Sequence, residues 1–285
     1  MANIGATLVK ELRERTGAGM MDCKKVLVEA DGDLERGAEL LRERGIVKAR
    51  GKSGRVTSEG RIATSVSDDG RAAALIEVNC ETDFVAKTGE FQEFCEQLCD
   101  LARDEQPDDL DALASMRLGN GSVEERLTAM IAKLGENVRV RRFGRLQATE
   151  NACISSYVHA GGKIGALVHV EAEDPSDSKV IELGHNLCLH VTATNPLGVS
   201  REDIPAREVE RERNALRAQA EAEGKPPQII EKMVEGRLRK FFQEVALLEQ
   251  PLVMDPDTTV AKAAQAVGAK VVALRRFQLG EELPK

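Results

Sequence analysis

The chain has 285 residues, and its 40 Lys and Arg against 48 Asp and Glu give a net charge of −8 at pH 7. Binding to a nucleic-acid backbone draws most of its affinity from cationic side chains, so this balance argues against direct nucleic-acid contact. No apolar run reaches the roughly 18 to 20 residues of a membrane span, and charged residues interrupt the start of the chain. We therefore expect no membrane contact and no secretory signal, but a cytoplasmic protein of two or three small domains.

The six cysteines and four histidines are scattered along the chain, without Cys-x-x-Cys or His-Glu-x-x-His spacing. Metal sites need several ligands at defined spacings, so we predict buried thiols in a reducing compartment, no metal and no cofactor. Residues 45–53 nearly match a phosphate-binding loop. Five residues instead of four separate Gly45 from Gly51, and no strand precedes them, so we do not expect nucleotide binding there.

Apolar residues at helical spacing predict three short helices within residues 1–54. Asp33 suits the N-cap of the third helix, and Gly45 suits the C′ position that ends it. We expect residues 47–55 to form a flexible basic linker. A bundle of about 45 residues has a marginal core, which favours a binding module over a source of stability.

The rest of the chain contains a strand–strand–helix–strand plan twice, over residues 55–147 and 148–285. In the first copy, a corner at residues 82–84 separates two strands from a helix. The third strand of that copy contains Val-Arg-Arg-Phe at 140–143, and the third strand of the second copy contains Leu-Arg-Arg-Phe at 274–277. Two such halves predict an α+β core of two subdomains, each an antiparallel sheet covered by helices.

Residues 200–250 interrupt the second copy. Residues 206–223 are rich in Arg, Glu and Ala, and Gly-Lys-Pro-Pro at 224–227 forces a reversal before a second amphipathic helix. The pattern predicts an inserted helical hairpin, a short coiled coil that projects from the core. The alternative is that the hairpin packs on the sheet.

Four blocks of the chain resemble bacterial elongation factor Ts. They are Thr-Gly-Ala-Gly-Met-Met-Asp-Cys-Lys-Lys at 16–25, Glu-Val-Asn-Cys-Glu-Thr-Asp-Phe-Val-Ala-Lys at 77–87, the loop at 157–165, and Glu-Lys-Met-Val-Glu-Gly-Arg at 231–237. The resemblance implies a guanine nucleotide exchange factor that promotes GDP release from the GTPase elongation factor Tu during translation elongation, without covalent chemistry. It also implies a three-helix, ubiquitin-associated-like N-terminal bundle before the two-part core.

The resemblance also implies roles for the corner formed by Thr82, Asp83, Phe84 and Val85. This corner would enter the GTPase near its magnesium and nucleotide, with Phe84 as an apolar wedge. Asp83 would hold the corner and disturb polar contacts around the metal. The residues taken alone allow another interpretation, in which Asp83 is a helix N-cap and Phe84 is a core anchor.

A second contact with the GTPase is implied for the loop with His159, Gly161 and Gly162. Two adjacent glycines are also what a plain hairpin turn requires. Relatives often have Gly directly after the His and Arg at the last place, where this chain has Ala160 and Lys163.

The resemblance further implies that residues 16–25, with Met20 and Met21, dock the N-terminal bundle on the GTPase. Some relatives continue beyond the last strand into a final helix, so we expect that contact to be missing or reduced here. An adaptor that binds partners through the bundle alone is the alternative function. An enzyme would need a convergent set of acid, base or nucleophilic residues, and the sequence does not indicate one.

Overall fold

The computed structural model describes residues 4–224 and 226–283, which form two compact units. The first unit contains the described residues of Met1–Arg61, Ile76–Phe143 and Leu279–Lys285, and the second contains Ile62–Leu75 and Gly144–Gln278. The N-terminal helices therefore share a unit with part of the core. The domain boundaries expected from the sequence stay a prediction.

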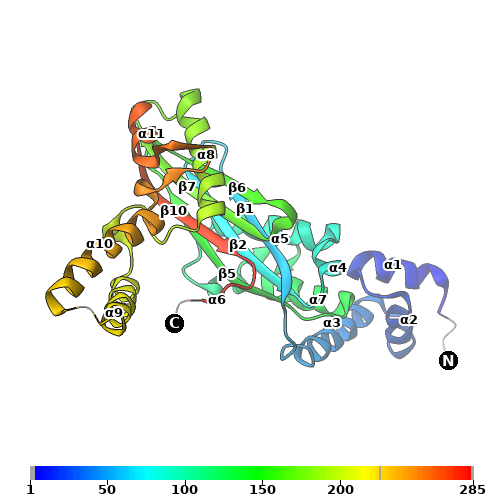
Figure 1. The fold of residues 1–285 in the computed structure, drawn as a ribbon. Coiled ribbons are helices and arrows are strands. Elements are labelled where there is room, and N and C mark those ends of the chain that lie inside the picture. The colour runs from blue at the N-terminus through cyan, green and yellow to red at the C-terminus, as the bar shows by residue number, and fades with distance from the viewer. Residues whose placement is uncertain (1–3, 225, 284–285) are drawn as a thin grey trace. The chain divides into compact units, whose positions relative to one another are not determined.

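The N-terminal bundle consists of α1 (Ala6–Thr16), α2 (Met20–Glu29) and α3 (Leu34–Arg50) (Figure 1). Its core contains apolar side chains of all three helices, and the buried ones come from α1 and α2: Val9, Leu12, Cys23, Val26 and Leu27. The Asp33 side chain accepts hydrogen bonds from the amides of Glu35 and Arg36 at 2.8 and 3.1 Å, which confirms the predicted N-cap.

The third helix does not end at Gly45, as predicted, but continues to Arg50. Gly45 is buried, and a Cβ built there lies 3.6 Å from the Cβ of Ala132 in α7 (Val123–Leu134). The packing of α3 on α7 outweighs the roughly 1 kcal/mol that a glycine costs inside a helix. Residues 47–50 consequently belong to the helix, so the prediction of a flexible linker that starts at Val47 is wrong.

The first sheet has the strand order β1-β2-β5, with β1 (Glu59–Val66), β2 (Ala72–Cys80) and β5 (Val138–Gln147). The central strand, β2, is buried along nearly its whole length. Helix α5 (Gly89–Asp104) begins at the N-cap Thr88 and buries Phe91, Phe94 and Leu98 on one face. Between α5 and α7 lie α6 (Leu110–Ser115), β3 (Arg117–Leu118) and β4 (Gly121–Ser122).

The second sheet repeats this order as β10-β7-β6, with β6 (Ala152–His159), β7 (Ile164–Ala172) and β10 (Ala269–Gln278). Both pairings are antiparallel, and the middle strand is again the second of the copy. The core under this sheet includes residues of α8 (Ser178–Thr194) and α11 (Val260–Ala266). The predicted repeat and the α+β class are confirmed.

A buried histidine connects α8 to the segment after the helical insertion. His190 accepts the amide of Val253 at Nδ1, at 3.2 Å, so its proton lies on Nε2 and is donated to Gln250 at 2.8 Å. Burial lowers the pKa of His190 below its ordinary value. The remaining short elements of this region are η2 (Arg201–Asp203), η3 (Leu247–Glu249), β8 (Pro251–Leu252) and β9 (Asp255–Thr259).

The predicted insertion is a helical hairpin of α9 (Ala206–Ala222) and α10 (Pro227–Val245), drawn in yellow in Figure 1. Lys225, in the expected reversal, lies outside the described residues. The two helices have a small core of their own, in which Ala220, Ile230, Val234 and Leu238 are buried. At the base of the hairpin the chain is closed by hydrogen bonds from the Leu197 amide to Val245 O, at 2.8 Å, and from the Leu247 amide to Gly198 O, at 3.0 Å.

The helices that the structure describes include none with the length and apolar character of a membrane span.

Candidate functional site

The corner after β2 is a single helical turn, α4 (Asp83–Ala86), with a threonine at each end. Thr82 has an extended backbone, and its Oγ1 accepts the Val85 amide at 3.4 Å. The Val85 carbonyl accepts the amide and the hydroxyl of Thr88, at 3.0 and 2.8 Å. The turn is therefore defined at its start by Thr82 and at its end by Thr88.

Two adjacent apolar side chains of this turn point in different directions. Val85 is 7% exposed and anchors the turn, whereas Phe84 is 80% exposed. The interpretation of Phe84 as a core anchor is therefore wrong. A phenylalanine that passes from water into an apolar contact gains about 1.5–3 kcal/mol, which makes Phe84 a ready anchor for a partner.

Asp83 is not the N-cap of the turn, because Thr82 occupies that position. The Asp83 carboxylate pairs with Nζ of Lys87, one turn later, at 2.6 Å. This pair raises the pKa of Lys87, chiefly through the hydrogen bond. Both partners are substantially exposed, so the pair places a carboxylate beside Phe84 without contributing much to stability.

The residues that flank the corner are bound to the segment after α7. The Thr82 amide and hydroxyl donate to the Glu136 carboxylate at 3.0 and 2.7 Å. The Glu81 carboxylate accepts the Asn137 amide at 2.6 Å, and this hydrogen bond, stronger than the opposing effect of burial, lowers the pKa of Glu81. The thiol of Cys80 donates to Thr82 O at 3.1 Å; burial, with the negative charge of Glu136 next in weight, raises its pKa to about 12.

The predicted loop of the second unit lies between β6 and β7 as the short helix η1 (Ala160–Gly162). Gly161 and Gly162 have φ values of +75° and +72°, which a residue with a Cβ adopts only with strain. The preceding His159 is exposed, and its Nδ1 lies 3.1 Å from the Tyr157 hydroxyl. The backbone of this turn therefore requires its two glycines, and His159 is held by a hydrogen bond at its edge.

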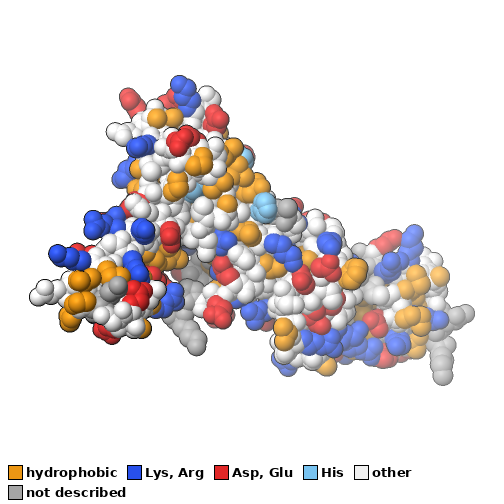
Figure 2. Space-filling view, in the orientation of Figure 1, with side chains coloured by type: hydrophobic (Ala, Val, Ile, Leu, Met, Phe, Trp, Pro, Cys, Tyr) orange, Lys and Arg blue, Asp and Glu red, His pale blue; other side chains and the backbone are white. Residues whose placement is uncertain are grey.

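Met20 and Met21 open α2 and are 57% and 63% exposed. Both lie in the first unit, as does the corner, whereas the loop belongs to the second unit. A groove of about 1200 Å³ in the first unit is lined by the turn before α2 and by residues of α3 and α7. Figure 2 shows Lys and Arg side chains gathered over α3. Nζ of Lys48, a residue of this helix, pairs with the Asp22 carboxylate at 2.9 Å.

In the part of the chain that the structure describes, no group of three or more His, Cys, Asp or Glu side chains is placed to hold a metal ion.

Comparison with known proteins assigns the chain to a family. The family model described as elongation factor TS matches residues 81–281, and the chain is 45% identical over 282 residues to elongation factor Ts of Thioalkalivibrio sulfidiphilus, with 99% of this chain and 94% of the relative covered. The chain belongs to the elongation factor Ts family. Elongation factor Ts of Methylococcus capsulatus is 47% identical over 285 residues, and that of Clostridium botulinum (strain Eklund 17B) is 45% identical over 289 residues. Both alignments cover 99% of this chain; they cover 94% of the Methylococcus capsulatus protein and 95% of the Clostridium botulinum protein. The protein is thus a translation elongation factor.

Within this elongation factor Ts chain, sequence reasoning missed the buried carboxylate of Glu77. Its side chain is fully buried in β2 and accepts hydrogen bonds from Arg141, Arg142, Asn79 and the Gly280 amide. Burial raises the pKa of Glu77, but these hydrogen bonds outweigh burial, so the pKa lies below its ordinary value. A signal was present in the sequence, because a glutamate inside an apolar strand must find partners.

Sequence reasoning also missed Glu136 and Asn137, which follow the glycine that ends α7. Besides binding the corner, the Asn137 side chain donates to the carbonyls of Arg55 and Ser53 at 2.9 and 3.4 Å. These contacts join segments about eighty positions apart in the chain, so no local sequence pattern predicts them. Residues 53–55, predicted as part of a flexible linker, are therefore bound to the core of the first unit.

Proposed function

We propose that this member of the elongation factor Ts family is a guanine nucleotide exchange factor that promotes GDP release from elongation factor Tu in the cytoplasm. The observation that carries the proposal is Phe84, which is 80% exposed on a turn bound at both ends. Aromatic side chains are enriched at protein–protein interfaces, so a phenylalanine held in solvent on an ordered turn is suited to burial in a partner. The exchange involves no covalent step, so the protein acts as a binding factor and not as an enzyme.

The mechanism is one of linked binding. An exchange factor that binds the nucleotide-free GTPase better than the nucleotide-bound form lowers nucleotide affinity by the same factor. A weakening of about 10⁴-fold needs roughly 5.5 kcal/mol of differential binding. Phe84 supplies about 1.5–3 kcal/mol of this through apolar burial. The remainder requires further contacts, for which we propose Met20 and Met21 of the bundle and the loop with His159, Gly161 and Gly162.

The other residues of the corner have supporting roles in this proposal. Thr82 begins the turn, and Val85, which is 7% exposed, anchors it to the unit. Asp83 carries a carboxylate next to the wedge, paired with Lys87 at 2.6 Å. A negative charge brought near the magnesium site of the GTPase competes for the polar groups around the metal, which favours release of the metal with GDP.

The test is release of fluorescently labelled GDP from elongation factor Tu. The intact protein should accelerate release, and Phe84→Ala should lower the rate about 10- to 100-fold, the equivalent of about 1.5–3 kcal/mol. Val56→Ala is the matched control, because Val56 is 83% exposed in the same unit and lies outside the corner. Absence of acceleration by the intact protein would refute the proposal. A Phe84→Ala variant as fast as Val56→Ala would remove the wedge from the mechanism.

The alternative function, an adaptor that acts through its N-terminal bundle, is favoured by the exposed pair Met20 and Met21. Replacing both with alanine separates the two hypotheses. An exchange factor should need a higher concentration of the variant and reach a lower maximal release rate, but it should still accelerate release, since the corner is unchanged. An adaptor should lose its partner altogether, and the intact adaptor should not accelerate nucleotide release.

A further inference from the structure

The helical turn that carries Phe84 is too short to be stable by itself. Helix α4 has four residues, whereas isolated helices shorter than about 12 residues are marginal in water. Its N-cap hydrogen bond, from the Val85 amide to Thr82 Oγ1, is long at 3.4 Å. The direction in which Phe84 projects therefore depends on contacts from elsewhere in the first unit.

The Glu136 carboxylate accepts hydrogen bonds from both the amide and the hydroxyl of Thr82, the residue that begins this turn. Glu136 Oε2 accepts the Thr82 amide at 3.0 Å, and Glu136 Oε1 accepts the Thr82 hydroxyl at 2.7 Å. Hydrogen bonds to an ionised acceptor are roughly twice as strong as neutral ones. Two bonds to the backbone and side chain of one residue fix its orientation as well as its position. Because the Thr82 hydroxyl donates its hydrogen bond to Glu136, the lone pairs of Thr82 Oγ1 remain available to accept the Val85 amide.

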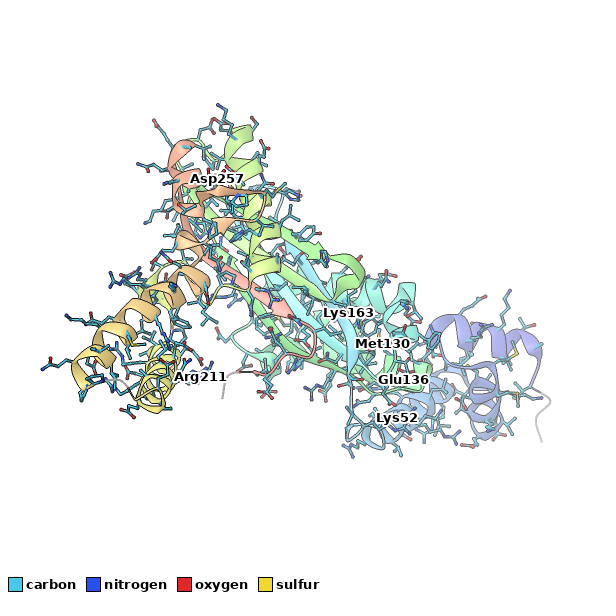
Figure 3. The ribbon with its side chains drawn as sticks, viewed as in Figure 1. Lys52, Met130, Glu136, Lys163, Arg211 and Asp257 are labelled. Atoms are coloured by element: carbon cyan, nitrogen blue, oxygen red, sulfur yellow. The ribbon has the colours of Figure 1, made fainter. Side chains whose placement is uncertain are left out.

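Glu136 is itself held by its two neighbours in the chain. Gly135 ends α7 with φ +79°, and its carbonyl accepts a hydrogen bond from Nζ of Lys52. Asn137 donates its amide to Glu81 at 2.6 Å, directly beside Thr82. Figure 3 labels Lys52 and Glu136, which lie close together near the ends of α3 and α7. The carboxylate thus projects from a segment fixed at α7, after α3 and at the corner.

We propose that Glu136 is a positioning residue for nucleotide exchange. It holds Thr82, and through Thr82 it sets the direction in which Phe84 enters the partner. The inference rests on the proposed exchange function and assigns Glu136 an effect that passes through Phe84. Without this carboxylate, Phe84 stays exposed but its turn samples several orientations, so fewer encounters place the ring productively.

A double-mutant cycle on GDP release tests this dependence. At saturating concentration, Glu136→Ala should lower the maximal release rate about tenfold. In a Phe84→Ala background, the same substitution should change the rate by less than about twofold, because coupled residues are not additive. Glu124→Gln, an exposed carboxylate at the other end of α7, is the control and should match the intact protein. Equal slowing by Glu136→Ala in both backgrounds would overturn the inference and leave Glu136 a purely structural role.

Conservative changes at Thr82 give a second readout. Thr82→Ser keeps the amide and hydroxyl donors. This variant should accelerate GDP release from elongation factor Tu as much as the intact protein does. Thr82→Val keeps the shape but loses the hydroxyl, and should resemble Glu136→Ala in its dependence on Phe84. Slowing by the serine variant equal to that of the valine variant would count against the role of the hydroxyl–carboxylate bond.

Hydrogen–deuterium exchange tests the positioning without any partner. In the isolated protein, Glu136→Ala should raise the amide exchange rate of residues 82–88 about tenfold, and Glu124→Gln should leave it unchanged. Unchanged exchange in Glu136→Ala overturns the inference, whatever the release rate. If the intact protein does not accelerate GDP release from elongation factor Tu, the proposed function and the role of Glu136 in it are both overturned. A fully active Glu136→Ala variant of an active protein overturns the inference alone.

Discussion

Replacing Glu77 with glutamine perturbs a buried charge while keeping the shape of the side chain. Oε1 of Glu77 accepts three hydrogen bonds, from Arg141 at 2.9 Å, Asn79 at 3.1 Å and the Gly280 amide at 3.0 Å. Oε2 accepts a hydrogen bond from Nε of Arg142 at 2.7 Å. The substituted amide keeps one oxygen for the three donors but turns an NH₂ group toward Arg142. Two donors then face each other in a buried site.

The size of the effect follows from this arrangement. Removing one partner of a buried ion pair costs about 3–5 kcal/mol. Arg142 retains a second partner, Glu281, at 2.7 Å, so we expect the lower end of that range, about 3 kcal/mol. Domains are stable by about 5–15 kcal/mol, and the loss should be plain in urea unfolding at pH 7 followed by circular dichroism. Glu281→Gln is the control, because the Glu281 side chain is 27% exposed, and we expect it to cost less than about 1 kcal/mol.

The pH dependence gives the same prediction a second test. The pKa of Glu77 is lowered from its ordinary value of 4.5 in the folded protein. Its contribution to stability is therefore complete above pH 4.5 and is lost as the pH falls below that value and through the folded-state pKa. The unfolding curves of the intact protein and of Glu77→Gln should converge on acidification. A cost under about 1 kcal/mol at pH 7, or a difference that persists undiminished in acid, would refute the reasoning.

Two further predictions concern the fold. Gly60→Ala should destabilise the first unit by more than about 3 kcal/mol, because a Cβ at this φ of +144° lies 2.1 Å from Val78 O; a urea midpoint like that of the intact protein would contradict this. For the buried His190, whose pKa is lowered from 6.5, stability should fall as the pH drops below about 6.5, because the unfolded chain then binds the proton more readily. The melting temperature measured from pH 8 to pH 5 checks this, and His190→Gln should flatten the curve in part, since His169 also has a lowered pKa.

Much of the fold was predictable because its determinants are local. The apolar periodicity of α5 and the Asp33 cap of α3 were sufficient to predict those helices. The end of α3 was not, because contact with α7, and not the propensity of Gly45, decides it. For Phe84, the resemblance implied an exposed wedge, but the residues alone left the core anchor open, because one turn of helix has too few residues for periodicity to show which face is buried. The contacts of Glu136 join residues 54 positions apart and leave no local trace.

The closed base of the α9–α10 hairpin determines how easily the length of this arm can change. Leu197 and Gly198 are hydrogen bonded to Val245 and Leu247, so the arm begins and ends at nearly the same place within the second unit. Lengthening a connection whose ends already meet costs little, about 0.6 kcal/mol per doubling of a flexible loop. Evolution is therefore free to extend, shorten or exchange the arm while the sheet beneath it stays as it is, and a designer can do the same.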